Sequence, residues 1–177
     1  MVIAGSLPVG VAPEAVGRLI TVIKEQGAKA VADTSGPALV SAVHAGPWLI
    51  KPNDDELAEL VGRPVNALDD LVAEARRMNS DGIATVAVSL GARGAVFVED
   101  GQALLARPPR IEAVSTVGAG DAMIGGLVAG MALHLSLEKR ARRASALAAA
   151  TVMQAGPAIQ DLNTAKTLES RIEITNL

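Results

Sequence analysis

Cysteine is absent from this sequence of 177 residues, and aromatic side chains are nearly absent, with Trp48 and Phe97 as the two examples. Without cysteine the chain has neither disulfides nor thiolate metal ligands, which fits a reducing cytoplasm. No apolar run is long enough to span a bilayer, and no charged and then apolar leader opens the chain. We therefore expect a cytoplasmic protein whose core is built from Ala, Val, Leu and Ile.

Concentrated charge is also lacking, because the formal net charge is −3 and charged residues make up 20% of the chain. This gives no general attraction to nucleic acid or to an anionic membrane, so we expect neither as a partner. The one basic cluster, Lys139 to Arg143, lies in an amphipathic helical pattern without aromatic neighbours and is interpreted as a solvated face. His44 and His134 have no metal-ligating neighbours, and the G-x-x-x-x-G-K-[ST] pattern of P-loop kinases does not occur.

Hydrophobic residues make up 50% of the chain, and their pattern alternates between that of strands and that of helices. Strands are expected near 1–4, 28–32, 48–50, 85–89, 95–99 and 102–106, the last two joined as a hairpin around Asp100-Gly101. Helices are expected near 13–26, 37–44, 54–61, 69–79, 122–133 and 137–153. The alternation predicts an α/β fold with a mostly parallel sheet and helices on both faces. We place one domain at 1–156 and a loosely attached polar tail at 157–177.

Polar motifs follow four of the predicted strands. They are Gly5-Ser6, Asp33-Thr34-Ser35-Gly36, Lys51-Pro52-Asn53 and Ser89-Leu90-Gly91. The carboxyl ends of parallel strands share one edge of a sheet, and ligands bind at that edge in such folds. The four motifs therefore predict one shared site.

The most specific pattern is Ser115 to Asp121, with the sequence STVGAGD, directly before an apolar helical stretch. Small residues leave the backbone N–H groups of Gly118, Ala119 and Gly120 open to an anion at a helix N-terminus. Such donors can hold a transferring phosphoryl group, and Asp121 at their edge can accept a proton from an attacking hydroxyl. From these residues alone, it is an equally good interpretation that Asp121 is an N-cap and that the glycines serve a turn.

The same residues resemble a known family. Thr116 to Asp121, with Gly125-Gly126 and Ala129-Gly130, is similar to the C-terminal signature of the ribokinase/PfkB carbohydrate kinases. Four further segments resemble that family's motifs in the same order: Gly5 to Val11, Asp33 to Gly36 with Leu39, Lys51 to Asn53 with Glu56-Leu57, and Ser89 to Gly91 with Gly94. In the first of them, Val9 replaces the usual second proline. The first two of these four segments, Gly5 to Val11 and Asp33 to Gly36, favour the sugar-phosphate branch, which contains phosphofructokinases and tagatose-phosphate kinases, over ribokinase and adenosine kinase.

The resemblance implies a ribokinase-like, Rossmann-type sandwich that uses ATP to phosphorylate a hydroxyl of a sugar phosphate. It assigns the catalytic base to Asp121 and the anion hole to residues 118–120. It also implies that Asn53 and Glu56 organise Mg²⁺, largely through water. Without the family, the favoured interpretation of Asn53 and Glu56 is a helix cap with an exposed acid.

Three more polar residues receive roles from the same resemblance. Lys51 is expected near the nucleotide phosphates, although a surface lysine is an equal alternative. Ser6 is expected near the phosphate of the substrate, and Asp33 is expected to support the metal and phosphate region.

Small residues are expected to line the nucleotide. The resemblance places Ser89, Gly91 and Gly94 beside its phosphates and ribose, and Ala146 to Ala150 beside adenine. A turn between two strands and a close helix contact are the respective alternatives.

The resemblance covers only the C-terminal portion of the family's chain. The N-terminal strands, the small β-lid and the early positions that grip the sugar are missing, and family members often pair through that lid. A homodimer is therefore expected only for a full-length form. Two hypotheses stay open for this chain: a working kinase, or a truncated and catalytically inactive nucleotide-binding remnant. A Rossmann-type dinucleotide binder comes last, because no G-x-G-x-x-G follows the first predicted strand.

Overall fold

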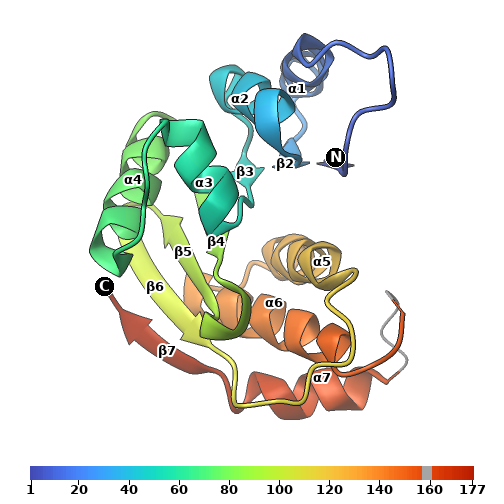
Figure 1. Ribbon diagram of the computed structural model, residues 1–177, viewed down its shortest axis with the longest axis vertical. Helices are drawn as coiled ribbons and strands as arrows, with labels where there is room; N and C mark the ends of the chain where they lie inside the picture. Colours follow the sequence, from blue (N-terminus) through green and yellow to red (C-terminus); the bar gives the residue numbers. More distant parts are fainter. Residues whose placement is uncertain (157–160) are drawn as a thin grey trace. The chain divides into compact units, whose positions relative to one another are not determined.

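The computed structural model describes residues 1–156 and 161–177, which form an α/β fold with seven strands and seven α-helices (Figure 1). The strands follow the order β1-β2-β3-β4-β5-β6-β7. β1 pairs with β2, β2 with β3 and β3 with β4 in parallel, whereas β6 and β7 are antiparallel. The predicted α/β class with a mostly parallel sheet is confirmed. Within these residues, none of the helices combines the length and apolar character that crossing a membrane requires.

The secondary structure follows the predicted elements closely. The strands are β1 Val2–Ala4, β2 Val31–Asp33, β3 Leu49–Ile50, β4 Thr85–Ser89, β5 Ala95–Glu99, β6 Gln102–Arg107 and β7 Glu173–Asn176. The helices are α1 Glu14–Glu25, α2 Gly36–Ala45, α3 Asp54–Val61, α4 Leu68–Ser80, α5 Ala119–Ala132, α6 Leu137–Val152 and α7 Leu162–Glu169, with a 3₁₀ turn η1 at Gly91–Arg93. Every predicted strand and helix is present, and no end is displaced by more than three residues.

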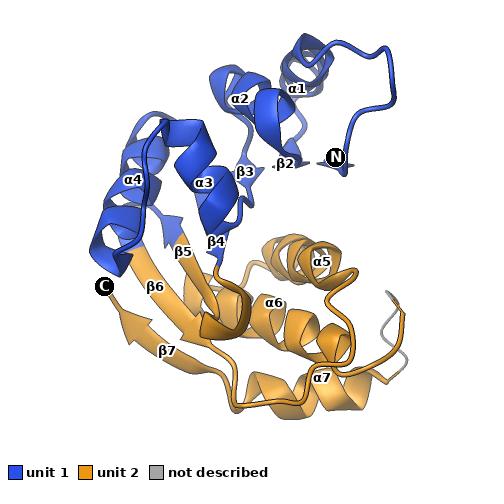
Figure 2. Cartoon of the chain, viewed as in Figure 1, with its two compact units in different colours: residues 1–89, 98–102 blue, residues 90–97, 103–177 orange. Residues whose placement is uncertain are grey.

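The chain divides into two compact units (Figure 2). Unit 1 comprises residues 1–89 and 98–102, and unit 2 comprises residues 90–97 and 103–177. The division therefore falls after β4 and within β5 and β6, away from the predicted domain boundary at 156.

Unit 1 alternates strands and helices. Its strands are neighbours in chain order, and right-handed crossovers between such strands place the connecting helices on one face. Accordingly α1 packs on α2, and α2 packs on α3. Val16, Ile20 and Ile23 form the buried face of α1 at the spacing of a helix. The largest fully buried side chains of this unit are Ile20, Leu39, Leu49, Ile50, Leu57, Val86 and Val88.

Unit 2 is built on the close contact of α5 and α6. A Cβ placed on Gly126 would lie 2.6 Å from the Cα of Ala144, so no side chain fits between the two backbones. A Cβ placed on Gly130 would likewise lie 2.6 Å from Cγ of Arg140. Glycine at these positions lets α5 approach α6 closely, and this contact fixes the helix that carries Asp121.

The basic cluster of α6 takes part in this packing. Arg140 is buried, and its Nε donates a hydrogen bond to the carbonyl oxygen of Leu135 at 3.1 Å. Arg142 pairs with Glu138 on the same helix at 2.9 Å. Lys139 is exposed. The predicted solvated face is therefore correct for Lys139 and wrong for Arg140.

The C-terminal residues 162–176 form a helix and a strand that pack on the rest of unit 2, which corrects the expectation of a loosely attached tail for this part. Helix α7 packs on α6, and β7 pairs with β6. Ala165, Leu168 and Ile172 are buried, and a guanidinium nitrogen of Arg142 donates to the carbonyl of Ile172. Residues 157–160 of the predicted tail lie outside the described residues.

Candidate functional site

The polar motifs of unit 1 lie together at the carboxyl ends of its parallel strands. The backbone N–H of Gly5 donates to the carbonyl oxygen of Asp33 at 2.9 Å, which joins the motifs after β1 and β2. The N–H of Ser89 donates to the carbonyl oxygen of Pro52 at 3.0 Å, and Asn53 forms a parallel bridge with Ser89. The motif after β3 is thereby joined to the motif after β4. Strand order thus brings together segments that are far apart in the sequence.

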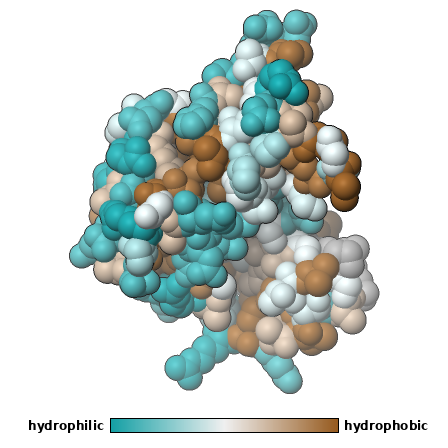
Figure 3. Space-filling model, turned by 45° about the horizontal axis from the view of Figure 1, so that its top comes forward, coloured by the Kyte–Doolittle hydropathy of each residue, from teal (hydrophilic) through white to brown (hydrophobic). Residues whose placement is uncertain are grey.

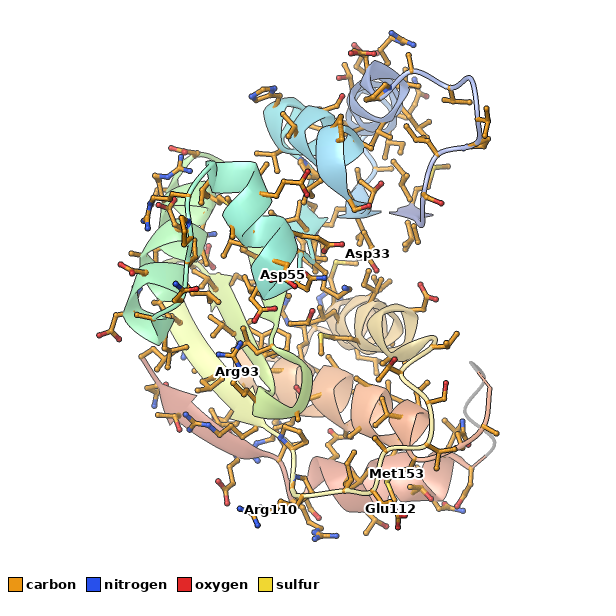
Figure 4. The ribbon with its side chains drawn as sticks, viewed as in Figure 1. Asp33, Asp55, Arg93, Arg110, Glu112 and Met153 are labelled. Atoms are coloured by element: carbon orange, nitrogen blue, oxygen red, sulfur yellow. The ribbon has the colours of Figure 1, made fainter. Side chains whose placement is uncertain are left out.

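Lys51, which is buried, and Asp33, which is partly buried, form an ion pair within this group, and Figure 4 labels Asp33 where β2 ends. Lys51 Nζ lies 3.1 Å from Asp33 Oδ1, and the two side chains are 8% and 17% exposed. The pair forms because Asp33 ends β2 and Lys51 directly follows β3, the neighbouring strand. The alternative of a surface lysine is therefore wrong. Sequence reasoning assigned each residue a role near phosphate but gave no sign of their contact.

Asn53 and Glu56 cap the N-terminus of α3 reciprocally. Asn53 Oδ1 accepts a hydrogen bond from the N–H of Glu56 at 2.7 Å. Glu56 Oε2 accepts one from the N–H of Asn53 at 2.8 Å. Acidic residues Asp54, Asp55 and Glu56 fill the first turn, where the helix dipole favours negative charge (Asp55 is labelled in Figure 4). The helix cap that these two residues predict is thus confirmed, whereas Glu56 is partly buried and not the exposed acid of that interpretation.

The capping pair also fits a magnesium ion that keeps most of its water. Mg²⁺ prefers oxygen ligands and retains several waters when the protein offers few ligands. The described residues contain no group of three or more His, Cys, Asp or Glu side chains that could hold a metal ion. Asn53 Oδ1 and Glu56 Oε2 are engaged in the cap, whereas Glu56 Oε1 accepts no hydrogen bond within residues 1–156 and 161–177. With so few oxygen atoms available, Asn53 and Glu56 suit contact with Mg²⁺ through bound water better than direct coordination on all sides by protein.

The segment predicted to form an anion hole lies at the start of α5, in unit 2. Gly118 is the N-cap residue, with φ 82° and ψ −2°, and this left-handed backbone favours glycine. The helix begins at Ala119, so the N–H groups of Gly120 and Asp121 lie in the first turn and have no acceptor inside the helix. The first hydrogen bond of the helix runs from the N–H of Ala122 to the carbonyl of Gly118 at 2.9 Å. The N–H of Ala119, which was predicted to be open, instead donates to the carbonyl oxygen of Thr116 at 3.3 Å. The donors without an acceptor in the first turn are therefore those of Gly120 and Asp121.

The carboxylate of Asp121 is exposed in that first turn. It makes no hydrogen bond or ion pair with any residue that the structure describes, and it does not cap the helix. The interpretation of Asp121 as an N-cap is therefore wrong, because Gly118 occupies that position. A free carboxylate beside unpaired backbone donors is chemically suited to accept a proton next to a bound anion.

The loop before α5 is fixed to the end of α6. The N–H groups of Val114 and Ser115 both donate to the carbonyl oxygen of Val152, at 2.7 and 3.2 Å. Ser115 Oγ accepts a hydrogen bond from the N–H of Val117 at 3.3 Å. The carbonyl of Val152 thus anchors the loop, and the bond between Ser115 and Val117 shapes the turn that leads into the helix.

The glycines and alanines predicted to line the nucleotide have structural roles of their own. Gly94 has φ +97°, and a Cβ placed on it would lie 2.0 Å from the carbonyl oxygen of Ala106 in β6. Gly91 has φ +58° and open space around it. Ala146 and Ala150 are 1% and 3% exposed. Glycine at 94 is therefore required by the fold alone, and contacts of these residues with a nucleotide stay predictions.

Ser6 lies on the exposed loop between β1 and α1. Val9 on the same loop and Val117 before α5 are also exposed. The face shown in Figure 3 has hydrophobic areas interrupted by hydrophilic ones. Isolated apolar side chains on a surface are normal, so we infer no docking surface from them. The role of Ser6 near a substrate phosphate stays a prediction.

Comparison with known proteins places this geometry in a family. The model of the pfkB family carbohydrate kinases matches residues 1–165. The chain is 40% identical to 1-phosphofructokinase of Escherichia coli K12 over 172 residues, which are 97% of this chain and 55% of that protein. It is 43% identical to 1-phosphofructokinase of Rhodobacter capsulatus over 155 residues, which are 88% of this chain and 49% of that protein.

A solved structure shows the same fold. Phosphofructokinase-2 of Escherichia coli, in complex with substrates and products, superposes with a TM-score of 0.91 at 35% identity. The match covers 96% of this chain and 56% of that one. The chain thus spans about half the length of the curated relatives and solved structures that it matches. The family model, however, covers most of this chain. The chain belongs to the pfkB family of carbohydrate kinases.

Proposed function

We propose that this chain carries the ATP-binding and catalytic part of a kinase that phosphorylates a hydroxyl of a sugar phosphate. The observation that carries the proposal is the free, exposed carboxylate of Asp121 in the first turn of α5. Asp121 directly follows the small residues Gly118, Ala119 and Gly120 in the sequence. Fructose 1-phosphate is the first substrate to test, since curated relatives are 1-phosphofructokinases. Fructose 6-phosphate and tagatose 6-phosphate are the others.

The reaction is an in-line phosphoryl transfer. The oxygen of the sugar hydroxyl forms a bond to the γ-phosphorus of ATP while the bond to the β–γ bridging oxygen breaks and ADP leaves. The proton of the hydroxyl passes to Asp121. The N–H groups of Gly120 and Asp121, which have no acceptor inside α5, donate to the oxygens of the transferring group, where negative charge is held in the transition state.

The residues at the strand ends of unit 1 bind the phosphates of ATP. Lys51 supplies an ammonium group there, and Ser89 with Gly91 lies beside the nucleotide. Asn53 and Glu56 would hold Mg²⁺ through water, and that ion supplies charge neutralisation on the phosphates when it is bound. The capping bonds keep Asn53 and Glu56 in fixed positions at the start of α3.

A nucleotide-binding module without transfer activity is the second candidate. It would bind ATP through the strand ends of unit 1 without transferring the phosphoryl group. A tetrameric inhibited form is described for Escherichia coli phosphofructokinase-2. By analogy, we include self-association of a full-length form in the proposal.

The test is release of ADP from MgATP by this chain with each of the three sugar phosphates in turn. Asp121→Asn should lower kcat by about 10²–10⁴-fold, the usual contribution of a general base, and leave ATP affinity nearly unchanged. Asp70→Asn is the matched control, because Asp70 is an exposed acid in the first turn of α4. ATP binding without turnover would favour the second candidate, and absence of both would reject the proposal.

A further inference from the structure

The ion pair of Lys51 and Asp33 is less exposed than the surface pairs of the same unit, although Asp33 is only partly buried. Its side chains are 8% and 17% exposed at a separation of 3.1 Å. Arg77 and Asp81 are also 3.1 Å apart, but their side chains are 57% and 63% exposed. Removing two charges from water is unfavourable, and well-packed apolar residues often stabilise a protein more than a buried pair does. Stability alone therefore does not explain this pair.

The carboxylate side of the pair is held firmly. Asp33 is the last residue of β2 and lies opposite Ala4 in the register with β1. Its carbonyl oxygen accepts the hydrogen bond from the N–H of Gly5 at 2.9 Å. Its backbone is thus fixed on the side of β1, and this restricts where its side chain can go.

The lysine side of the pair is flexible without its partner. The ammonium of Lys51 ends a four-carbon stem with many rotamers, and it acts as a point charge rather than a planar fork. Its backbone N–H donates to the carbonyl of Ala32 at 3.3 Å, which fixes the start of the side chain but not its end. The contact with Asp33 fixes the position of the ammonium group. Lys51 also lies two residues before Asn53, at the strand ends to which the proposed function assigns the phosphates of ATP.

We infer that Asp33 is a positioning residue, whose carboxylate holds the ammonium of Lys51 in place for the phosphates of ATP. The inference rests on the proposed function. Asp33 acts through Lys51 and need not contact ATP. The expected change in ATP affinity on removal of the carboxylate is therefore opposite to the change expected from charge repulsion alone. A carboxylate that only repels phosphate would, on removal, let ATP bind more tightly, whereas loss of a positioning residue weakens binding.

The test is a double-mutant cycle on MgATP affinity, measured by titration calorimetry. Asp33→Asn should weaken binding about tenfold, the scale of one lost hydrogen bond to a charged group. In a Lys51→Met background the same change should have less than about a twofold effect, because there is no ammonium to position. Asp33→Glu restores the charge and should recover most of the affinity. Tighter or unchanged binding in Asp33→Asn, or equal losses in both backgrounds, would overturn the inference.

A second measurement examines the pair without ATP. Unfolding of unit 1 by urea is followed through fluorescence of Trp48, the one tryptophan of the chain. The drop in urea midpoint caused by Asp33→Asn should be smaller in the Lys51→Met background, since the double variant leaves no unpaired buried charge. Equal drops would overturn the inference. Asp81→Asn is the control, and it should change neither ATP affinity nor the midpoint appreciably.

The two measurements separate this inference from the proposed function. Failure of the wild-type chain to bind MgATP would reject the proposed function and, with it, the role of Lys51 toward ATP. This holds even if the urea midpoints still show coupling between Asp33 and Lys51. ATP binding that is indifferent to Asp33 would reject only the positioning role.

Discussion

Asn53 and Glu56 share two hydrogen bonds across the first turn of α3, each residue accepting from the backbone N–H of the other, at 2.7 and 2.8 Å. The pair that the family resemblance links to Mg²⁺ is therefore also the pair that starts the helix. A variant at either position can act through the metal or through the cap. The two effects are separable, because glutamine can replace glutamate in a capping box but carries no charge.

We predict that Asn53→Ala lowers the free energy of unfolding by about 1 kcal/mol through loss of the N-cap. Glu56→Gln should lower it by less than about 0.5 kcal/mol, because the amide oxygen can still accept from the N–H of Asn53. Glu56→Gln should nevertheless raise the Mg²⁺ concentration needed for ATP binding. Urea unfolding followed at Trp48 and a Mg²⁺ titration with ATP measure the two effects. Equal destabilisation by both variants would contradict the separation.

Neighbouring glycines of α5 should respond in opposite directions to alanine. Gly126→Ala places a methyl group 2.6 Å from Cα of Ala144, and overpacking of this kind typically lowers the free energy of unfolding by about 1–3 kcal/mol. Gly125 is exposed, with no heavy atom within 4 Å of an added Cβ. Gly125→Ala should therefore stabilise the helix by about 0.5–1 kcal/mol. Denaturant unfolding followed by circular dichroism measures both, and destabilisation by Gly125→Ala would show that the site is more crowded than the structure indicates.

The sequence predicted elements with strong local patterns and missed those that depend on tertiary contacts. Strand β4 and helix α3 begin and end where hydrophobic and capping patterns place them. Helix α5 begins three residues earlier than predicted. Glycine at 118 and 120 lowers the intrinsic helix propensity, so the local pattern places the start too late. Packing of α5 on α6 compensates for that low propensity. Strand β7 has only four residues and a polar composition, and its pairing with β6 defines it.

Contacts within the candidate site were predictable only where the two residues lie close together in the sequence. The reciprocal cap of Asn53 and Glu56 follows from a spacing of three residues, and its alternatives could be stated in advance. The pair of Asp33 and Lys51 depends on β2 lying next to β3, and hydrophobic periodicity carries no information on strand order. A sequence can therefore mark both residues as polar strand ends without showing that they meet.

Two glycines after β4 should distinguish a structural requirement from a nucleotide contact. Gly94→Ala places Cβ 2.0 Å from the carbonyl oxygen of Ala106 at a backbone φ of +97°, so we expect a loss of about 3 kcal/mol or more in the free energy of unfolding. Gly91→Ala meets open space at φ +58° and should lose only about 1–2 kcal/mol. Weaker ATP binding in Gly91→Ala at full folding would support a nucleotide contact. The same result in Gly94→Ala would reflect misfolding of the strand pair.

Acid should selectively weaken the contact of α4 with the segment before it. Glu74 receives hydrogen bonds from Arg77 at 2.9 Å and from Arg63 at 2.8 Å, and the Arg77 contact is the largest cause of a lowered pKa of Glu74, from an ordinary value of 4.5. A carboxylate with a lowered pKa in the folded state stabilises the protein above its unfolded pKa. That contribution is lost as pH falls below 4.5 and through the folded value.

Glu74→Gln should therefore be less stable than the wild type at pH 7, by about 0.5 kcal/mol because both arginines are largely exposed and screened. The difference should shrink as pH falls below 4.5 and should also shrink in 1 M salt, where the Debye length is about 3 Å. Urea unfolding at several pH values measures it. Replacing Arg63 and Arg77 together with Gln should abolish the acid-sensitive part while Glu74 is kept. If the acid-sensitive part of the stability persists in this double arginine variant, the acid response belongs to other carboxylates.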